Sequence, residues 1–120
     1  MYTLFVVNGL YDILCALTLL DVVKIPILQD LHISMFHREL TDISKRLLGY
    51  WIMTYGFMRL SNNFFLIYES YILEILFILN ETYKKNIIAE KAIFVVIFSL
   101  ILSHKALYIY TLTPNNINRQ

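Results

Sequence analysis

Long apolar runs occupy most of this 120-residue chain, at residues 2–20, 47–61, 64–80 and 88–112. Hydrophobic residue types make up 58% of the sequence, which is more than a soluble domain of this size needs for its core. About 20 apolar residues, at roughly 1.5 Å of rise each, let a helix cross a hydrocarbon core of about 30 Å. We therefore expect an all-α polytopic membrane protein, with one four-helix transmembrane domain over residues 1–112 and a polar tail at 113–120.

The polar stretch after the first run has apolar residues at helical spacing, namely Leu28, Leu31, Met35, Phe36, Leu40 and Ile43. This spacing predicts one amphipathic helix over residues 28–43 that lies in the membrane interface. Its histidines, His32 and His37, are five residues apart, whereas two metal-binding histidines on one helix face are usually four apart. We expect a solvated face here and no metal site.

Basic residues are concentrated in the first and third loops between the runs, as Lys24, Arg38, Lys45, Arg46, Lys84, Lys85 and Lys91. The opposite side of the membrane would hold only Arg59, Lys105 and Arg119. Because basic loops stay on the cytoplasmic or matrix side, this bias predicts the orientation of the four spans. The endoplasmic reticulum and the mitochondrial inner membrane are the expected locations, with a viral membrane as a further alternative.

Two charged residues flank the predicted turn at Asn62-Asn63. Arg59 lies about 5 Å and Glu69 about 10 Å into the membrane when rise is counted from that turn. A charge at membrane depth costs at least about 2.5 to 3.5 kcal/mol and needs a partner. We therefore predict a structural ion pair between Arg59 and Glu69 that locks the bundle.

Two further carboxylates, Asp12 and Glu74, fall near mid-membrane by the same counting, without an obvious cation. Two acids at one depth would favour protonation of one of them, or a shared proton. With His104, they form a possible proton or ion site. The alternative is that each is a neutral acid hydrogen-bonded to Tyr, Asn or a backbone carbonyl, and the sequence leaves both open.

Gly49 and Gly56 are seven residues apart on one face of the second run, where they would let another helix approach closely. The sequence contains no glycine-rich phosphate loop and no CxxC, HExxH or GxSxG motif. We therefore expect a protein that is not an enzyme, without catalytic residues, cofactor or metal. The net charge of +1, without a basic face, argues against a nucleic-acid partner.

Arg46, Gly49, Trp51 and Arg59 form the pattern R-x-x-G-x-W-x7-R-L. This pattern resembles the second-span signature of the ergosterol-biosynthesis scaffold family, small four-span proteins of the endoplasmic reticulum that tether sterol C-4 demethylation enzymes. The pattern G-x6-G-x2-R, from Gly49 through Gly56 to Arg59, is similar to the DoxX-like four-span family. The first resemblance implies a scaffolding function.

Together these features predict a non-catalytic membrane scaffold or accessory subunit, whose partners are other integral membrane proteins of a complex and the lipid bilayer. The alternative from another class is a small proton or ion conductor that uses Asp12 and Glu74. A third possibility, an enzyme of lipid or quinone chemistry, would need a pocket lined by His104 and the carboxylates.

Overall fold

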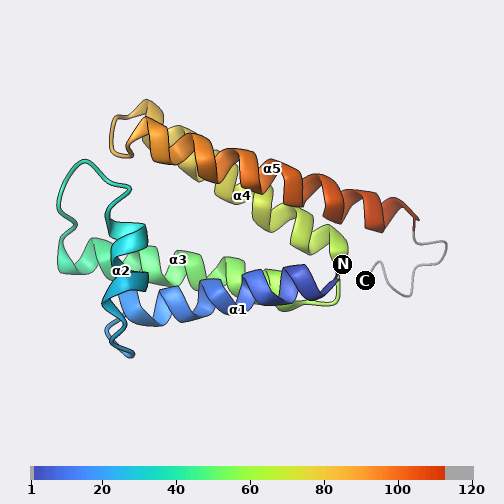
Figure 1. Cartoon of the computed structure of the whole chain (residues 1–120), viewed down its shortest axis with the longest axis horizontal. Coiled ribbons are helices and arrows are strands. Elements are labelled where there is room, and N and C mark those ends of the chain that lie inside the picture. The colour runs from blue at the N-terminus through green and yellow to red at the C-terminus, as the bar shows by residue number, and fades with distance from the viewer. Residues whose placement is uncertain (1, 113–120) are drawn as a thin grey trace.

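The computed structural model describes residues 2–112, which form five α-helices, so the all-α class is confirmed. The helices are α1 (Tyr2–Leu19), α2 (Pro26–Ile33), α3 (Asp42–Leu60), α4 (Phe64–Tyr83) and α5 (Ala89–Leu112) (Figure 1). All four apolar runs fold as helices, but α3 begins at Asp42, five residues before the expected second run. The predicted polar tail at 113–120 lies outside the described residues.

The long helices pack as two pairs, α1 with α3 and α4 with α5. The pairs converge toward the α3–α4 turn and diverge at the other end, where α2 lies against α1 (Figure 1). A buried cluster of Phe5, Ile67, Tyr71, Leu102 and Ala106 connects α1, α4 and α5. The two helix pairs thus form a wedge, and side chains of this cluster connect the pairs at its narrow end.

The backbones of α1 and α3 touch where their glycines meet. A Cβ atom added to Gly56 would lie 2.9 Å from the Gly9 carbonyl oxygen and 2.6 Å from Cγ1 of Ile13. A Cβ atom at Gly49 would lie 3.2 Å from the Ala16 carbonyl oxygen. Gly49 and Gly56 thus both lie in the α1–α3 contact, and Gly9 is a third member that the sequence analysis did not include.

We expect Gly56→Ala to lower the thermal unfolding temperature, because the methyl group would meet the α1 backbone. Overpacking of this kind costs about 1 to 3 kcal/mol, and the gain of about 1 kcal/mol in helix propensity offsets only part of it. Gly49→Ala is the matched control, since its Cβ contacts are 3.1 Å or longer and the two effects should nearly cancel. Equal melting temperatures for the two variants would contradict this account of the contact.

At the wide end of the wedge, the segment after α2 pairs with the α4–α5 turn. Backbone hydrogen bonds run from the His37 amide to the Asn86 carbonyl at 2.9 Å and from the Ile88 amide to the Met35 carbonyl at 2.7 Å. Phe36 and Ile87 form an isolated antiparallel bridge. The first and third loops, which hold most of the lysine and arginine residues, therefore lie together at the wide end of the molecule.

This pairing corrects the prediction of one amphipathic helix over residues 28–43. The helix begins at Pro26 and ends at Ile33, and the chain then turns toward the α4–α5 loop. Helix α3 begins after Thr41, whose hydroxyl oxygen accepts a hydrogen bond from the Ser44 amide at 3.2 Å. The apolar spacing continues through this segment, but contacts with residues that are distant in sequence stop the helix.

Among the described helices, α5 alone is both long and apolar enough to cross a membrane. The apolar part of α1, Thr3–Leu19, is slightly too short to be counted with α5. Helix α3 carries Asp42, Lys45, Arg46 and Arg59, which reduces its mean hydropathy. Length and composition thus support one membrane-spanning helix where the sequence analysis expected four.

Candidate functional site

Arg59 is the largest fully buried side chain among the described residues and lies near the C-terminal end of α3. Its Nη1 donates to Oδ2 of Asp12, and its Nη2 donates to Oε1 of Glu74 at 2.6 Å. Its Nε donates to the Ser70 hydroxyl oxygen at 3.1 Å. Every nitrogen of the guanidinium group is therefore engaged, as a buried cation requires. We call Arg59, Asp12 and Glu74 the ionic cluster.

Helical spacing explains why these residues meet. Ser70 and Glu74 are four residues apart in α4, so they lie on the same face of the helix. Asp12 lies on the buried face of α1, three residues before the fully buried Cys15. The ring of Tyr71 supports the guanidinium from one side, with its centroid 3.9 Å from Cζ of Arg59. Three helices are thus joined at one arginine.

Further hydrogen bonds extend the ionic cluster to the remaining long helix and along α1. The Ser99 hydroxyl of α5 donates to Oε1 of Glu74 at 3.1 Å. The Tyr71 hydroxyl donates to Oδ1 of Asn8 at 2.5 Å. Ser70, Ser99 and Asn8 are not among the site residues predicted from the sequence. Polar pairs four residues apart inside apolar runs, Asn8 with Asp12 and Ser70 with Glu74, are the signal that could have found two of them.

The expected partner of Arg59 is corrected: Arg59 pairs with Asp12 and Glu74 instead of Glu69. Counting rise along the helices gives depth but not the face on which a residue lies. Glu69 precedes Ser70 by one residue and is therefore turned by about 100° away from the cluster. His104 is also displaced from its expected place, because it is exposed on α5. Of the possible proton or ion site, only Asp12 and Glu74 come together.

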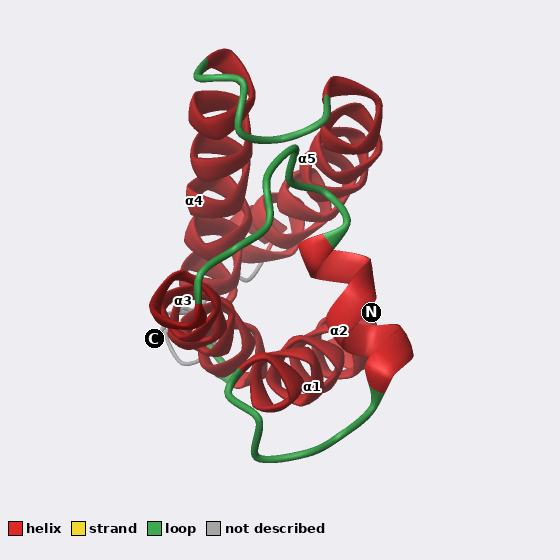
Figure 2. Ribbon diagram, turned by 90° about the vertical axis from the view of Figure 1, so that its left-hand side faces the viewer, coloured by secondary structure: helices red, strands yellow, loops and turns green. Residues whose placement is uncertain are grey.

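A cavity of about 550 Å³ lies beside the ionic cluster, which puts it in the size range of small-molecule sites. Residues from all five helices line this cavity. Figure 2 shows how these helices are arranged, with α2 beside α1 and with α4 and α5 on the opposite side of the molecule. The ionic cluster forms its polar wall, while Met35, Phe94 and Phe98 belong to its apolar wall. We call this space the central cavity.

His32 of α2 also lines the central cavity, where the sequence analysis expected a solvated histidine. Its Nδ1 is buried and forms no hydrogen bond of normal geometry. Burial lowers the pKa of the imidazole below its usual value of 6.5, and it outweighs the opposite effects of the Leu28 backbone and the Glu74 carboxylate. The imidazole is therefore neutral at pH 7 and offers one acceptor nitrogen.

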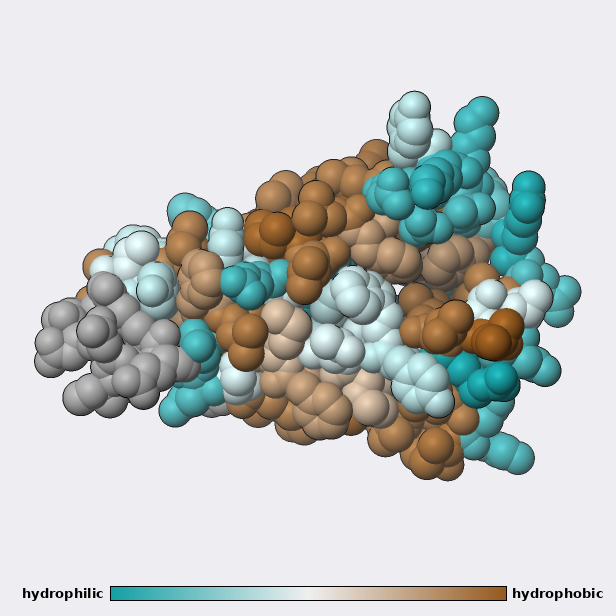
Figure 3. Space-filling view, turned by 180° about the vertical axis from the view of Figure 1, so that it is seen from behind, coloured by the Kyte–Doolittle hydropathy of each residue, from teal (hydrophilic) through white to brown (hydrophobic). Residues whose placement is uncertain are grey.

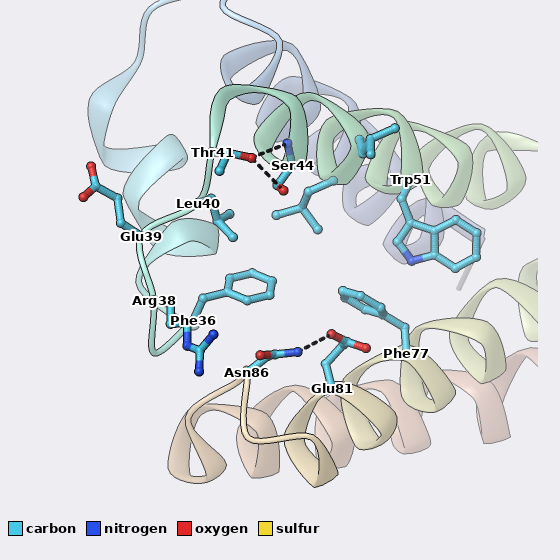
Figure 4. Close-up of a pocket in the computed structure, with 12 residues that line it drawn as sticks. Phe36, Arg38, Glu39, Leu40, Thr41, Ser44, Trp51, Phe77, Glu81 and Asn86 are labelled. Atoms are coloured by element: carbon cyan, nitrogen blue, oxygen red, sulfur yellow. Dashed lines mark hydrogen bonds between the residues drawn. The ribbon is translucent and has the colours of Figure 1, made fainter.

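A second cavity, of about 460 Å³, lies at the wide end of the wedge between α3 and α4 (Figure 4). The aromatic side chains of Phe36, Trp51 and Phe77 point into it, and the indole and Phe77 rings are 6.3 Å apart. On its polar edge, Nδ2 of Asn86 donates to Oε1 of Glu81 at 3.0 Å. Trp51, which the sequence analysis placed at the second span, thus lines a space between the two helix pairs.

Comparison of the chain with protein-family models, curated proteins and solved structures found no match in any of the three. The resemblances to the ergosterol-biosynthesis scaffold family and to the DoxX-like family therefore stay predictions that rest on Arg46, Gly49, Trp51, Gly56 and Arg59.

Proposed function

We propose that this protein spans a membrane with α1, α3, α4 and α5, and that it acts as a non-catalytic scaffold or accessory subunit of a larger membrane assembly. The observation that carries this proposal is the distribution of side chains. Large apolar groups lie on the outside of all four helices, while the ionic cluster is buried between them. A protein in water favours the opposite arrangement, and a bilayer favours this one.

The outer faces of the long helices support this reading in detail. Each helix exposes large apolar residues, among them Val7 and Leu10, Leu47 and Phe57, Leu76 and Leu79, and Phe94 and Ile97. Figure 3 shows hydrophobic residues over the middle of the molecule and hydrophilic ones gathered at the end that carries the α4–α5 turn. Helices of 18, 19, 20 and 24 residues measure about 27 to 36 Å, so α1 and α3 are slightly shorter than a hydrocarbon core of about 30 Å and α4 and α5 reach across it.

The charges of α3 fit the same arrangement. Asp42, Lys45 and Arg46 occupy its first turns at the wide end, next to the other basic loops. Lys45 pairs there with Asp21 at 3.4 Å. Arg59 is neutralised inside the bundle, so it does not face lipid. The low mean hydropathy of α3 is thus compatible with a span whose ends are polar and whose internal charge is paired.

Exposed aromatic side chains support an assembly function. Tyr50, Phe57 and Phe94 are large, rigid and exposed on the outer faces of α3 and α5. Side chains of this kind are enriched at protein interfaces, where they supply much of the contact energy. Neighbouring membrane proteins would cover them, and lipid would cover the rest.

A pull-down of tagged protein from its native membrane in mild detergent, followed by a native gel and mass spectrometry, tests this function. We expect one or more integral membrane proteins in stoichiometric amounts, and fractionation of the same cells would distinguish endoplasmic reticulum, mitochondrial and viral membranes. Tyr50→Ala with Phe57→Ala should weaken the association without lowering the melting temperature. A lone small species in the wild-type sample would reject the scaffold proposal.

The orientation of the spans gives a separate prediction. Cys15 is the only cysteine and is fully buried, so a Cys15→Ala background permits single-cysteine labelling. We expect Lys84→Cys and Arg38→Cys to react with a membrane-impermeant maleimide from the cytoplasmic or matrix side. Asn62→Cys should react only from the opposite side. Labelling of all three positions from one side would contradict the four-span arrangement.

A second candidate function is a small proton or ion conductor, favoured by the meeting of Asp12 and Glu74 at one arginine beside the central cavity. Flux through proteoliposomes that contain the purified protein tests it. A conductor would show flux above empty liposomes, and Asp12→Asn would abolish that flux. Wild-type protein without flux would reject this function and leave the scaffold proposal untouched.

A further inference from the structure

The central cavity combines one charged wall with one apolar wall. Asp12 and Glu74 reach its surface from α1 and α4, and Phe94 and Phe98 reach it from α5. The two phenylalanine rings are parallel to within 7°, with their centroids 6.5 Å apart. Both rings are also exposed on the outside of α5, Phe94 at 73% and Phe98 at 46%, so this wall of the cavity is open at the edge of that helix.

The charges on the cavity wall are not balanced. One guanidinium group, from Arg59, faces two carboxylates, from Asp12 and Glu74. Among the described residues that line the cavity, Lys91 is the only further cation, and its neighbour Glu90 offsets it. The Nζ of Lys91 already donates to the Ser34 carbonyl at 2.9 Å. By this formal count one negative charge remains, and a proton on one of the carboxylates or a bound cation would neutralise it.

The hydrogen bonds of Arg59 determine which sign of ligand would fit. All of its nitrogens already donate, to Asp12, Glu74 and Ser70. An anion would add a third negative charge beside the two carboxylates at Arg59, whereas a cation would offset the surplus negative charge. The neutral imidazole of His32, on the same cavity wall, offers an acceptor to a further N–H group.

We propose that the central cavity binds a small amphipathic organic cation, whose ammonium group bonds to Asp12 and Glu74 and whose apolar body packs against Phe94 and Phe98. Charge-assisted hydrogen bonds hold the ammonium end, and the aromatic rings bury the apolar end. This binding function is separate from the scaffold function, because the carboxylates that bind the ammonium group lie between the helices, whereas Tyr50 and Phe57 lie on the outer face of α3 and do not line the cavity.

Isothermal titration of the full-length protein in mild detergent with 2-phenylethylammonium chloride tests the proposal, and 2-phenylethanol is the uncharged analogue. Empty micelles correct for partition of both compounds into detergent. We expect saturable binding of the ammonium compound, at least about tenfold tighter than that of the alcohol. Absence of saturable ammonium binding, or equal affinity for both compounds, would overturn the proposal.

Two variants connect this binding to the ionic cluster. Asp12→Asn and Glu74→Gln each leave Arg59 with one carboxylate, so both should fold, as circular dichroism and melting can verify. Each should weaken ammonium binding by about tenfold or more and leave binding of the alcohol unchanged. Glu69→Gln is the matched control, because it removes the same charge from α4 outside the cavity. If Glu69→Gln weakens binding as much as Glu74→Gln does, the site is elsewhere.

Discussion

Replacing Arg59 with leucine is expected to destabilise the protein by about 3 to 5 kcal/mol, because it leaves the buried Asp12 carboxylate and the partly buried Glu74 carboxylate without their cation. The amount of folded protein should fall accordingly. Unfolding in mixed detergent micelles, followed by circular dichroism, measures the effect. Arg46→Leu is the matched control, since Arg46 is exposed on the same helix and should tolerate the change.

A combined variant separates charge pairing from simple packing. When Arg59, Asp12 and Glu74 are all replaced by leucine, no charge remains buried, and much of the lost stability should return. Normal accumulation of the Arg59→Leu single variant would show that the ionic cluster does not hold the bundle together. A triple variant as unstable as the single one would show that the volume of Arg59, and not its charge, is what matters.

Replacing Tyr71 with alanine is the second large effect that we expect. Tyr71 is almost fully buried in the cluster that connects α1, α4 and α5, and its ring supports the Arg59 guanidinium group. Loss of a buried aromatic ring costs about 3 to 5 kcal/mol. Tyr71→Phe removes only the hydrogen bond to Asn8, so its cost should be nearer 1 kcal/mol.

Tyr83→Ala is the control for Tyr71→Ala, because it makes the same change on α4 at an exposed side chain. Melting temperatures of the three variants should follow the order Tyr71→Ala, Tyr71→Phe, Tyr83→Ala, from lowest to highest. If Tyr71→Ala and Tyr83→Ala have the same melting temperature, the cluster around Tyr71 does not join the helix pairs in the way we describe.

The positions of the long helices could be predicted because their signals are local. An apolar run and a capping residue lie within the same short segment, as at Asn63, whose Oδ1 accepts from the Phe65 amide at 3.0 Å and starts α4. The segment that follows Ile33 could not be predicted in this way. It leaves the helix to pair with residues near Asn86, and nothing in its own spacing indicates that partner.

The residues of the candidate site could be predicted individually, but their contact with one another could not. Asp12, Arg59 and Glu74 are each recognisable as a charge inside an apolar run. Their meeting depends on how α1, α3 and α4 are rotated against each other, which packing decides. His32 shows the same limit, because its place in the central cavity depends on how α2 lies across the bundle.

If the protein spans a membrane as proposed, the order of the three cluster residues along the chain has a consequence for biosynthesis. Asp12 is made first, and a carboxyl group can enter lipid in its protonated, neutral form. Arginine cannot lose its proton in this way, but Arg59 follows Asp12 and can meet it as α3 packs on α1. Glu74 comes last and joins an arginine already in place. The Arg59 guanidinium group, which must stay charged during insertion, can therefore pair with Asp12, which has already been made.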